Sequence, residues 1–424
     1  MTILFDSLLI IVSSVILYFS YKRIIFNKYC SISNLTICII YIFNVLPIIF
    51  NYILGIPNYK TVYWYKPFIE PMNNNYVNAI YDIYILASLI ILNLYAKKNN
   101  YIDNNNYSSY QAIFNNKFFC LIAISSPLIM ILLNGTWRNF LIYSTITARG
   151  LSETSSSSLM TPFLLLSIFT FFSKFYNNKK MSFKKIFFST LYFFLVSWLS
   201  GKRFMIANLV MLFIFYVTKS DISSSVRKKI FKYLPFVFVL VLFFSGFYLV
   251  AIKPLKDTSF ISVYDMLRVD FGRDDVVKYV ISEEFFKNKP ILSYRFQSII
   301  SLFLFFVPRV FWPSKPYPHY MYLTSHLLNL SIFKLPAGTT PSWYEMCLCN
   351  FGLFGFFICV ISLPLICKIV DNSKSLDGKA LGLIIISSLL TQSMDVYSIY
   401  ILIIFLIHFF DKIFKGKKIK FVFK

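Results

Sequence analysis

Long apolar segments separated by short polar ones make up most of the chain. Eleven runs approach the length of a membrane-spanning helix: 3–19, 31–53, 76–95, 117–134, 157–173, 186–200, 204–218, 234–252, 346–367, 380–393 and 396–410. Because backbone polar groups in lipid must be satisfied within the segment, each run is predicted to be helical. The last two are short and fit either one bent helix or a tight hairpin. The pattern predicts an all-α polytopic membrane protein of about 11 (10 to 12) transmembrane helices.

Residues 253–345 form the only extended polar segment. Apolar spacing within it predicts a helix from Ser262, a break at Gly272 and a second helix through Phe286, with the apolar face on the membrane surface or over a cavity. The run 296–308 is too short for a span and predicts a re-entrant or interfacial helix. No linker or repeat marks another domain, so residues 1–424 are predicted to be one transmembrane domain with one long loop.

Composition narrows the class further. The chain is 57% hydrophobic and 14% charged, whereas soluble domains are about 25% charged, which excludes a soluble enzyme and a disordered chain. A net charge of +24 suggests nucleic acid in a soluble protein, but in a membrane protein basic residues hold loops in the cytoplasm. No nucleic-acid partner is therefore expected. Cys347 and Cys349 have no second pair and no nearby His, so neither a metal site nor a disulfide framework is expected.

The distribution of Lys and Arg predicts the orientation. With the N-terminus outside, the six cytoplasmic segments carry 25 Lys and Arg and five acids, while the rest of the chain carries 17 and 13. These segments are 21–30, 96–117, 174–185, 219–233, 368–379 and 411–424. One miscounted span would reverse the assignment of everything before it. In this topology the segment 253–345 faces outward.

Arginine and lysine are distributed differently between the two sides. Seven of the nine arginines face outward in this topology: Arg138, Arg149, Arg203, Arg268, Arg273, Arg295 and Arg309. Arg268 and Arg273 lie among aspartates, with which we expect them to pair. Arg149, Arg203 and Arg309 have no acid within three residues. Because the guanidinium fork binds phosphate or carboxylate in a bidentate manner, these three are candidates for binding an anionic substrate.

Three carboxylates lie inside or beside apolar runs: Asp6, Asp82 and Asp395. A buried carboxylate in a membrane is costly and suggests a functional role. The alternative is a structural pair with a cation such as Lys202. The sequence leaves these two interpretations open.

Short outward motifs carry the remaining chemistry, since no nucleotide-binding loop, HExxH or GxSxG motif is present. They are T-A-R-G at 147–150, S-G-K-R-F at 200–204, V-P-R-V-F-W-P-S-K-P at 307–316, G-T-T-P-S-W-Y-E at 338–345 and N-F-G at 350–352. Prolines fix a cationic loop in the third motif, and Glu345 enters the following helix. With these motifs and its layout of spans, the chain resembles the Wzy-type O-antigen and oligosaccharide repeat-unit polymerases. Many members of that family have an even number of spans, from which the eleven-span prediction departs.

The resemblance implies a glycosyltransferase of the bacterial inner membrane, multi-pass, with its active site on the periplasmic side. A growing glycan on undecaprenyl diphosphate would be transferred to a new lipid-linked repeat unit, with the lipid diphosphate as the leaving group. Membrane lipid and the chain-length regulator and flippase of the same pathway are the implied partners. No cofactor or metal ion is expected, because the outer acids near the predicted site are scattered.

Specific residues fit this reaction. Arg203 and Arg309 would stabilise the leaving diphosphate, and Arg149, Lys202 and Lys315 would add positive charge around diphosphate and glycan. Glu345 is the first candidate for the base, followed by Asp395 and His319. Glu345 is equally expected to be an acid that stabilises a helix N-terminus. The rival functions are an O-antigen ligase, which uses the same donor, and a lipid-linked oligosaccharide flippase.

Overall fold

The computed structural model describes eight longer stretches and several short pieces of the chain. The stretches are 2–26, 31–60, 62–99, 117–133, 259–304, 309–335, 338–373 and 376–392, with residue 307, and the pieces fall within 163–171, 188–199, 209–215 and at 232. Every regular element among these residues is a helix, which confirms the predicted all-α class for this part of the chain. The predicted runs 234–252 and 396–410 lie outside the described residues, and those at 157–173, 186–200 and 204–218 lie largely outside them.

The chain divides into two compact units. Unit 1 comprises 1–102, 223–372 and 386–395, and unit 2 comprises 103–222, 373–385 and 396–424. In unit 1, four described helical segments are long and apolar enough to cross a membrane. They are α1 (Thr2–Phe26), the continuous run α2 (Ser33–Ile40), η1 (Tyr41–Val45) and α3 (Leu46–Leu54), α5 (Asn75–Lys98), and α18 (Phe354–Asp371). The helices α7 (Lys117–Leu133) and α19 (Leu376–Thr391) are shorter.

The second span is interrupted in its middle by a π-helical turn. Pro47 has no N–H, so the carbonyl oxygen of Phe43 lacks the donor that an α-helix would provide four residues later. The backbone N–H of Arg273 donates to this oxygen over 3.0 Å. Tyr81 of α5 donates its hydroxyl to the neighbouring carbonyl of Asn44 over 2.8 Å. The break in the span thus creates the attachment point for the polar segment.

The predicted span at 346–367 is wrong at its N-terminal end. A separate helix, α17 (Trp343–Phe351), precedes α18, and Gly352 between them has φ +61°, a conformation that favours glycine. The two helices then pack so closely that a Cβ on Gly355 would lie 2.3 Å from the carbonyl oxygen of Cys347. A run of apolar residues does not reveal such a turn, because both helices are apolar.

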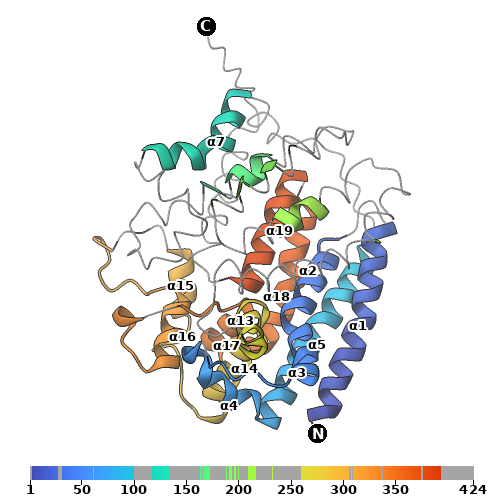
Figure 1. Cartoon of the computed structure of the whole chain (residues 1–424), viewed down its shortest axis with the longest axis vertical. Coiled ribbons are helices and arrows are strands. Elements are labelled where there is room, and N and C mark those ends of the chain that lie inside the picture. Colours follow the sequence, from blue (N-terminus) through green and yellow to red (C-terminus); the bar gives the residue numbers. More distant parts are fainter. Residues whose placement is uncertain are drawn as a thin grey trace. The chain divides into compact units, whose positions relative to one another are not determined.

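The polar segment forms several short helices at the end of unit 1 that contains the N-terminus (Figure 1). They are α13 (Phe260–Phe271), α14 (Asp274–Ile281), η5 (Ser282–Phe286), α15 (Gln297–Phe303), α16 (His319–Leu328) and η6 (Ile332–Lys334), and they meet η2 (Tyr63–Phe68) and α4 (Ile69–Met72). The predicted break at Gly272 is confirmed. The predicted helix at 296–308 is shorter, since α15 ends at Phe303.

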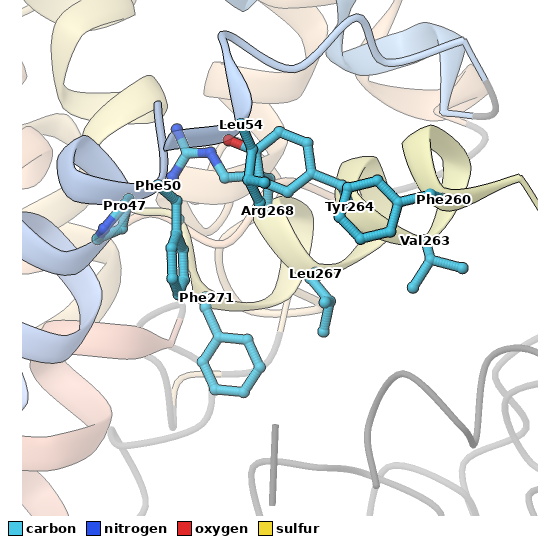
Figure 2. Close-up of a pocket in the computed structure, with 10 residues that line it drawn as sticks. Pro47, Phe50, Leu54, Phe260, Val263, Tyr264, Leu267, Arg268 and Phe271 are labelled. Atoms are coloured by element: carbon cyan, nitrogen blue, oxygen red, sulfur yellow. The ribbon is translucent and has the colours of Figure 1, made fainter. Parts of the chain in front are cut away.

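The expected surface position of this helix pair is only partly correct. α13 lines a pocket of about 170 Å³ together with α3, as predicted for a helix over a cavity (Figure 2). α14 is instead buried over its whole length and packs against α5, α17 and α4. Its charged residues have partners inside the protein, so burial does not leave them unpaired.

At the opposite end of unit 1, hydrogen bonds connect residues in or next to segments that the charge pattern assigns to the cytoplasm. Arg23, near the end of α1, donates to Asn93 near the end of α5 over 2.8 Å. Asp371, at the end of α18, accepts hydrogen bonds from the hydroxyl of Ser31 (2.5 Å) and the backbone N–H of Ile32 (2.9 Å). Hydrogen bonds thus join these helix ends to one another, while the side of the membrane on which they lie stays a prediction.

Candidate functional site

The loop that carries Arg309 and Lys315 is closed by its own backbone. The guanidinium of Arg309 donates to the carbonyl oxygens of Lys315 (2.6 Å) and Pro316 (3.3 Å) and lies 3.7 Å from the centre of the Tyr317 ring. The ammonium of Lys315 donates to the carbonyl oxygen of Val307 over 2.9 Å. The sequence prediction that this string forms a fixed cationic loop is therefore consistent with its hydrogen bonds.

The two cations of this loop lie close enough to affect each other. Partial burial lowers the pKa of Lys315, and the positive charge of Arg309 lowers it further. Within the described part of the chain, Arg309 forms no ion pair with a carboxylate. Both side chains donate to carbonyl oxygens of the loop, and an anion bound beside them would gain attraction from both cations.

Glu345 belongs to a capping box at the N-terminus of α17. Its Oε2 accepts the backbone N–H of Ser342 over 2.9 Å and also the Ser342 hydroxyl, while the Ser342 hydroxyl caps the helix. The helix-terminal role anticipated for this residue is thus present. No hydrogen bond from the described residues reaches Oε1. One oxygen of the carboxyl group is therefore held in place and the other remains available for proton exchange.

Burial gives Glu345 an unusual affinity for a proton. The residue is 0% exposed, and burial raises its pKa to about 7, although the hydrogen bonds from Ser342 and the charge of Arg273 favour the ionised form. A carboxyl group that titrates near neutral pH matches the requirement of a general base or acid. Its burial also places it away from solvent, so a substrate hydroxyl reaches it only if α17 or its surroundings open.

The raised pKa of Glu345 should make the free energy of unfolding depend on pH. Between pH 4.5 and about 7 the unfolded chain loses the Glu345 proton while the folded chain keeps it, so stability falls as pH rises through this window. Glu345→Gln preserves the capping box and removes the charge. We expect this variant to be more stable than the natural chain by about 3 kcal/mol above pH 7 and nearly equal to it near pH 4.5. Thermal unfolding of both proteins over this pH range measures the difference; equal curves at high pH would contradict the raised pKa.

His319 begins α16 and is completely buried. Burial lowers its pKa to about 3, so the imidazole is neutral at physiological pH. A general base that works at neutral pH needs a pKa of about 7 and access to substrate. His319 has neither of these in this structure. Its position next to the proline-rich loop favours packing of α16 over contact with substrate.

Asp6 and Asp82 are brought together between α1, α3 and α5. The hydroxyl of Tyr52 donates to Asp6 over 2.5 Å, and Asp82 has Asp6 and the ammonium of Lys278 as charged neighbours. Lys278 also lies 4.9 Å from the Tyr81 ring. The cation near these acids is therefore Lys278 from α14, a residue that the sequence analysis did not consider for this role.

A buried ion-pair network surrounds α14. Arg268 forms a bidentate pair with Asp274, with distances of 2.9 and 3.1 Å, as predicted from their spacing. Among the described residues Arg273 does not pair with an aspartate as expected: its side chain donates to the carbonyl oxygens of Thr391 and Gly272 and lies over Phe43. Local sequence cannot show that an arginine will cap the end of a distant helix.

The aspartates of this network differ in their proton affinity. Burial would raise the pKa of Asp274, but the charges of Arg268 and Lys278 hold it below its usual range. Burial and the adjacent charge of Asp274 raise the pKa of Asp275 to about 6, and its carboxyl group accepts the hydroxyl of Tyr59 over 2.8 Å. The contacts of Asp274 and Asp275 fix α14 in place, and they put charged groups in the interior of unit 1.

The N-F-G motif connects α17 to α15. Asn350 donates its amide to the hydroxyl of Ser298 (2.6 Å) and accepts the backbone N–H of the same residue (3.2 Å). Arg295 lies beside Gly352 and bridges Glu284 (2.7 Å) and the carbonyl oxygen of Cys349 (2.6 Å). These contacts hold α17, the helix that carries Glu345. They give the N-F-G motif a structural role that needs no bound substrate.

Several candidates cannot be placed. Arg149, Lys202, Arg203 and Asp395 lie outside the described residues. The pocket between α3 and α13 contains none of the predicted site residues.

Comparison with protein-family models, characterised proteins and solved structures gave no match. The predicted site residues that remain as candidates are Glu345, at the start of α17, and the two cations of the Arg309–Lys315 loop, which lie in separate elements.

Proposed function

We propose that this chain is a membrane-embedded glycosyltransferase that polymerises lipid-linked oligosaccharide repeat units, with a polyprenyl diphosphate as leaving group. The four apolar helices support a membrane location. The observation that carries the proposal is the pair of cations in the Arg309–Lys315 loop, which is held by carbonyl oxygens. Such a pair is suited to stabilising the charge that develops on a departing diphosphate.

In the proposed reaction, the acceptor hydroxyl attacks the anomeric carbon of the donor glycan. The bond from that carbon to the diphosphate oxygen breaks, and Arg309 and Lys315 bind the diphosphate that leaves. Glu345 takes the proton of the acceptor hydroxyl. The pKa of about 7 suits this exchange, because the ionised group accepts a proton near neutral pH and returns it to solvent when α17 or its surroundings open.

The proposal predicts a selective effect of the loop cations. Lys315→Gln removes one positive charge next to Arg309, so we expect the rate of polymerisation to fall on the order of 10²-fold. Lys334→Gln in η6 is the matched control, since it removes a cation from the same polar segment. Chain-length ladders from cells that contain equal amounts of each protein measure the effect. Equal ladders from both variants would contradict a role for the loop cations.

A further inference from the structure

The Arg309–Lys315 loop exposes two large apolar side chains. Val310 is 87% and Phe311 82% exposed, the highest values for large hydrophobic residues in the described part of the chain. Water is an unfavourable environment for such side chains, and adjacent exposed apolar residues often indicate an interaction site. These residues are at the tip of the loop, whereas the two cations lie at its base.

The loop is stiff enough to hold this tip away from the protein. Its base is closed by the bonds from Arg309 and Lys315 to backbone carbonyl oxygens, and the backbone N–H of Lys315 closes a turn onto Trp312 over 3.1 Å. Prolines at 313 and 316 further restrict the backbone. The loop therefore loses little conformational freedom when its tip binds to another surface.

A third exposed apolar residue extends the same surface. Phe333 of η6 is 78% exposed, and its ring lies 5.7 Å from that of Tyr317 in an edge-on arrangement. Arg309 stacks on the same Tyr317 ring. Val310, Phe311 and Phe333, with Arg309 and Lys315 beside them, form what we call the interfacial patch.

We propose that the interfacial patch inserts into the boundary between headgroups and acyl chains of the bilayer that unit 1 crosses, where Arg309 and Lys315 contact anionic lipid headgroups. Aromatic and aliphatic tips beside cations are typical of segments that lie in this boundary. The patch belongs to the same unit as the four spans, and its positive charge complements an anionic lipid surface. The inference rests on the membrane spans. If the proposed function also holds, the anchor keeps the two cations at the depth of a lipid-linked diphosphate.

Fluorescence quenching in a bilayer tests this proposal without any measurement of turnover. The full-length chain is placed in anionic lipid nanodiscs with a fluorescent amino acid at position 311, at 333 or, as a control, at the exposed polar position Lys289. Lipids with a nitroxide near the headgroup should quench positions 311 and 333 at least about two-fold more than position 289. Aqueous iodide should show the opposite preference.

Two results would overturn the proposal. Strong iodide quenching at 311 without quenching by lipid would place the tip in water. Protection of 311 from both quenchers would mean that another protein surface covers it. Replacing the anionic lipid with a zwitterionic one should weaken the lipid quenching at 311, and an unchanged signal would contradict the contact of Arg309 and Lys315 with headgroups.

Discussion

Glu345→Gln is expected to reduce polymerisation by about 10²- to 10⁴-fold while the protein stays folded and inserted in the membrane. Glutamine retains an oxygen that accepts the backbone N–H of Ser342, so the cap of α17 is preserved. It cannot take up a proton from the acceptor hydroxyl. Product release measured with equal amounts of the natural and variant proteins gives the effect directly.

A second substitution separates catalysis from helix capping. Glu345→Ala removes both the proton acceptor and the capping oxygen, so it should lose activity and also lower stability by about 1 kcal/mol at low pH. Glu345→Gln should lose activity with no loss of stability. If Glu345→Gln retains full activity, Glu345 is a capping residue and another group is the base.

Asp274→Asn is expected to destabilise the chain by about 3 to 5 kcal/mol. Arg268 and Lys278 are at most 4% exposed in their side chains and both bind Asp274, so removal of its charge leaves Arg268 without its bidentate partner and Lys278 with Asp82 as its acidic neighbour. The free energy of unfolding in detergent, or the midpoint of thermal unfolding, measures the loss. The predicted loss of stability is large because the ion pairs are buried, not because there are several of them.

An exposed ion pair provides the matched control for Asp274→Asn. Glu70 is 71% exposed in its side chain and binds Lys287 over 3.0 Å, so Glu70→Gln should cost less than about 1 kcal/mol. The double variant Arg268→Gln with Asp274→Asn should recover part of the stability, because it also removes the buried charge that Asp274→Asn alone leaves without its bidentate partner. Equal effects of Asp274→Asn and Glu70→Gln would contradict the buried network.

The main features predicted from sequence are those that depend on local pattern. Apolar runs predicted the helices that the structure contains at α1, α2 to α3, α5 and α18. Close spacing predicted that Arg268 pairs with a neighbouring aspartate, which the structure shows to be Asp274. The all-α class follows from the same runs. The number of spans and the periplasmic position of the polar segment stay predictions.

Features that depend on distant contacts were not predictable. A charged helix such as α14 has the same pattern whether water or buried partners satisfy its charges, so its burial was missed. Arg273 binds the carbonyl oxygen of Thr391 at the end of α19, more than a hundred residues away. The turn at Gly352 lies between two apolar helices and leaves no change in hydropathy. Pro47, by contrast, was a readable signal that a carbonyl in the second span would need another donor.

Purified protein in liposomes, supplied with polyprenyl-diphosphate-linked oligosaccharide units, tests the central claim most directly. The account predicts a ladder of longer lipid-linked glycans together with stoichiometric release of polyprenyl diphosphate, both reduced by Lys315→Gln but not by Lys334→Gln. Movement of intact units across the bilayer without release of diphosphate would indicate a flippase. Release only when a lipid A-core acceptor is added would indicate a ligase. Either of these outcomes, or no reaction at all, would contradict the proposed polymerase.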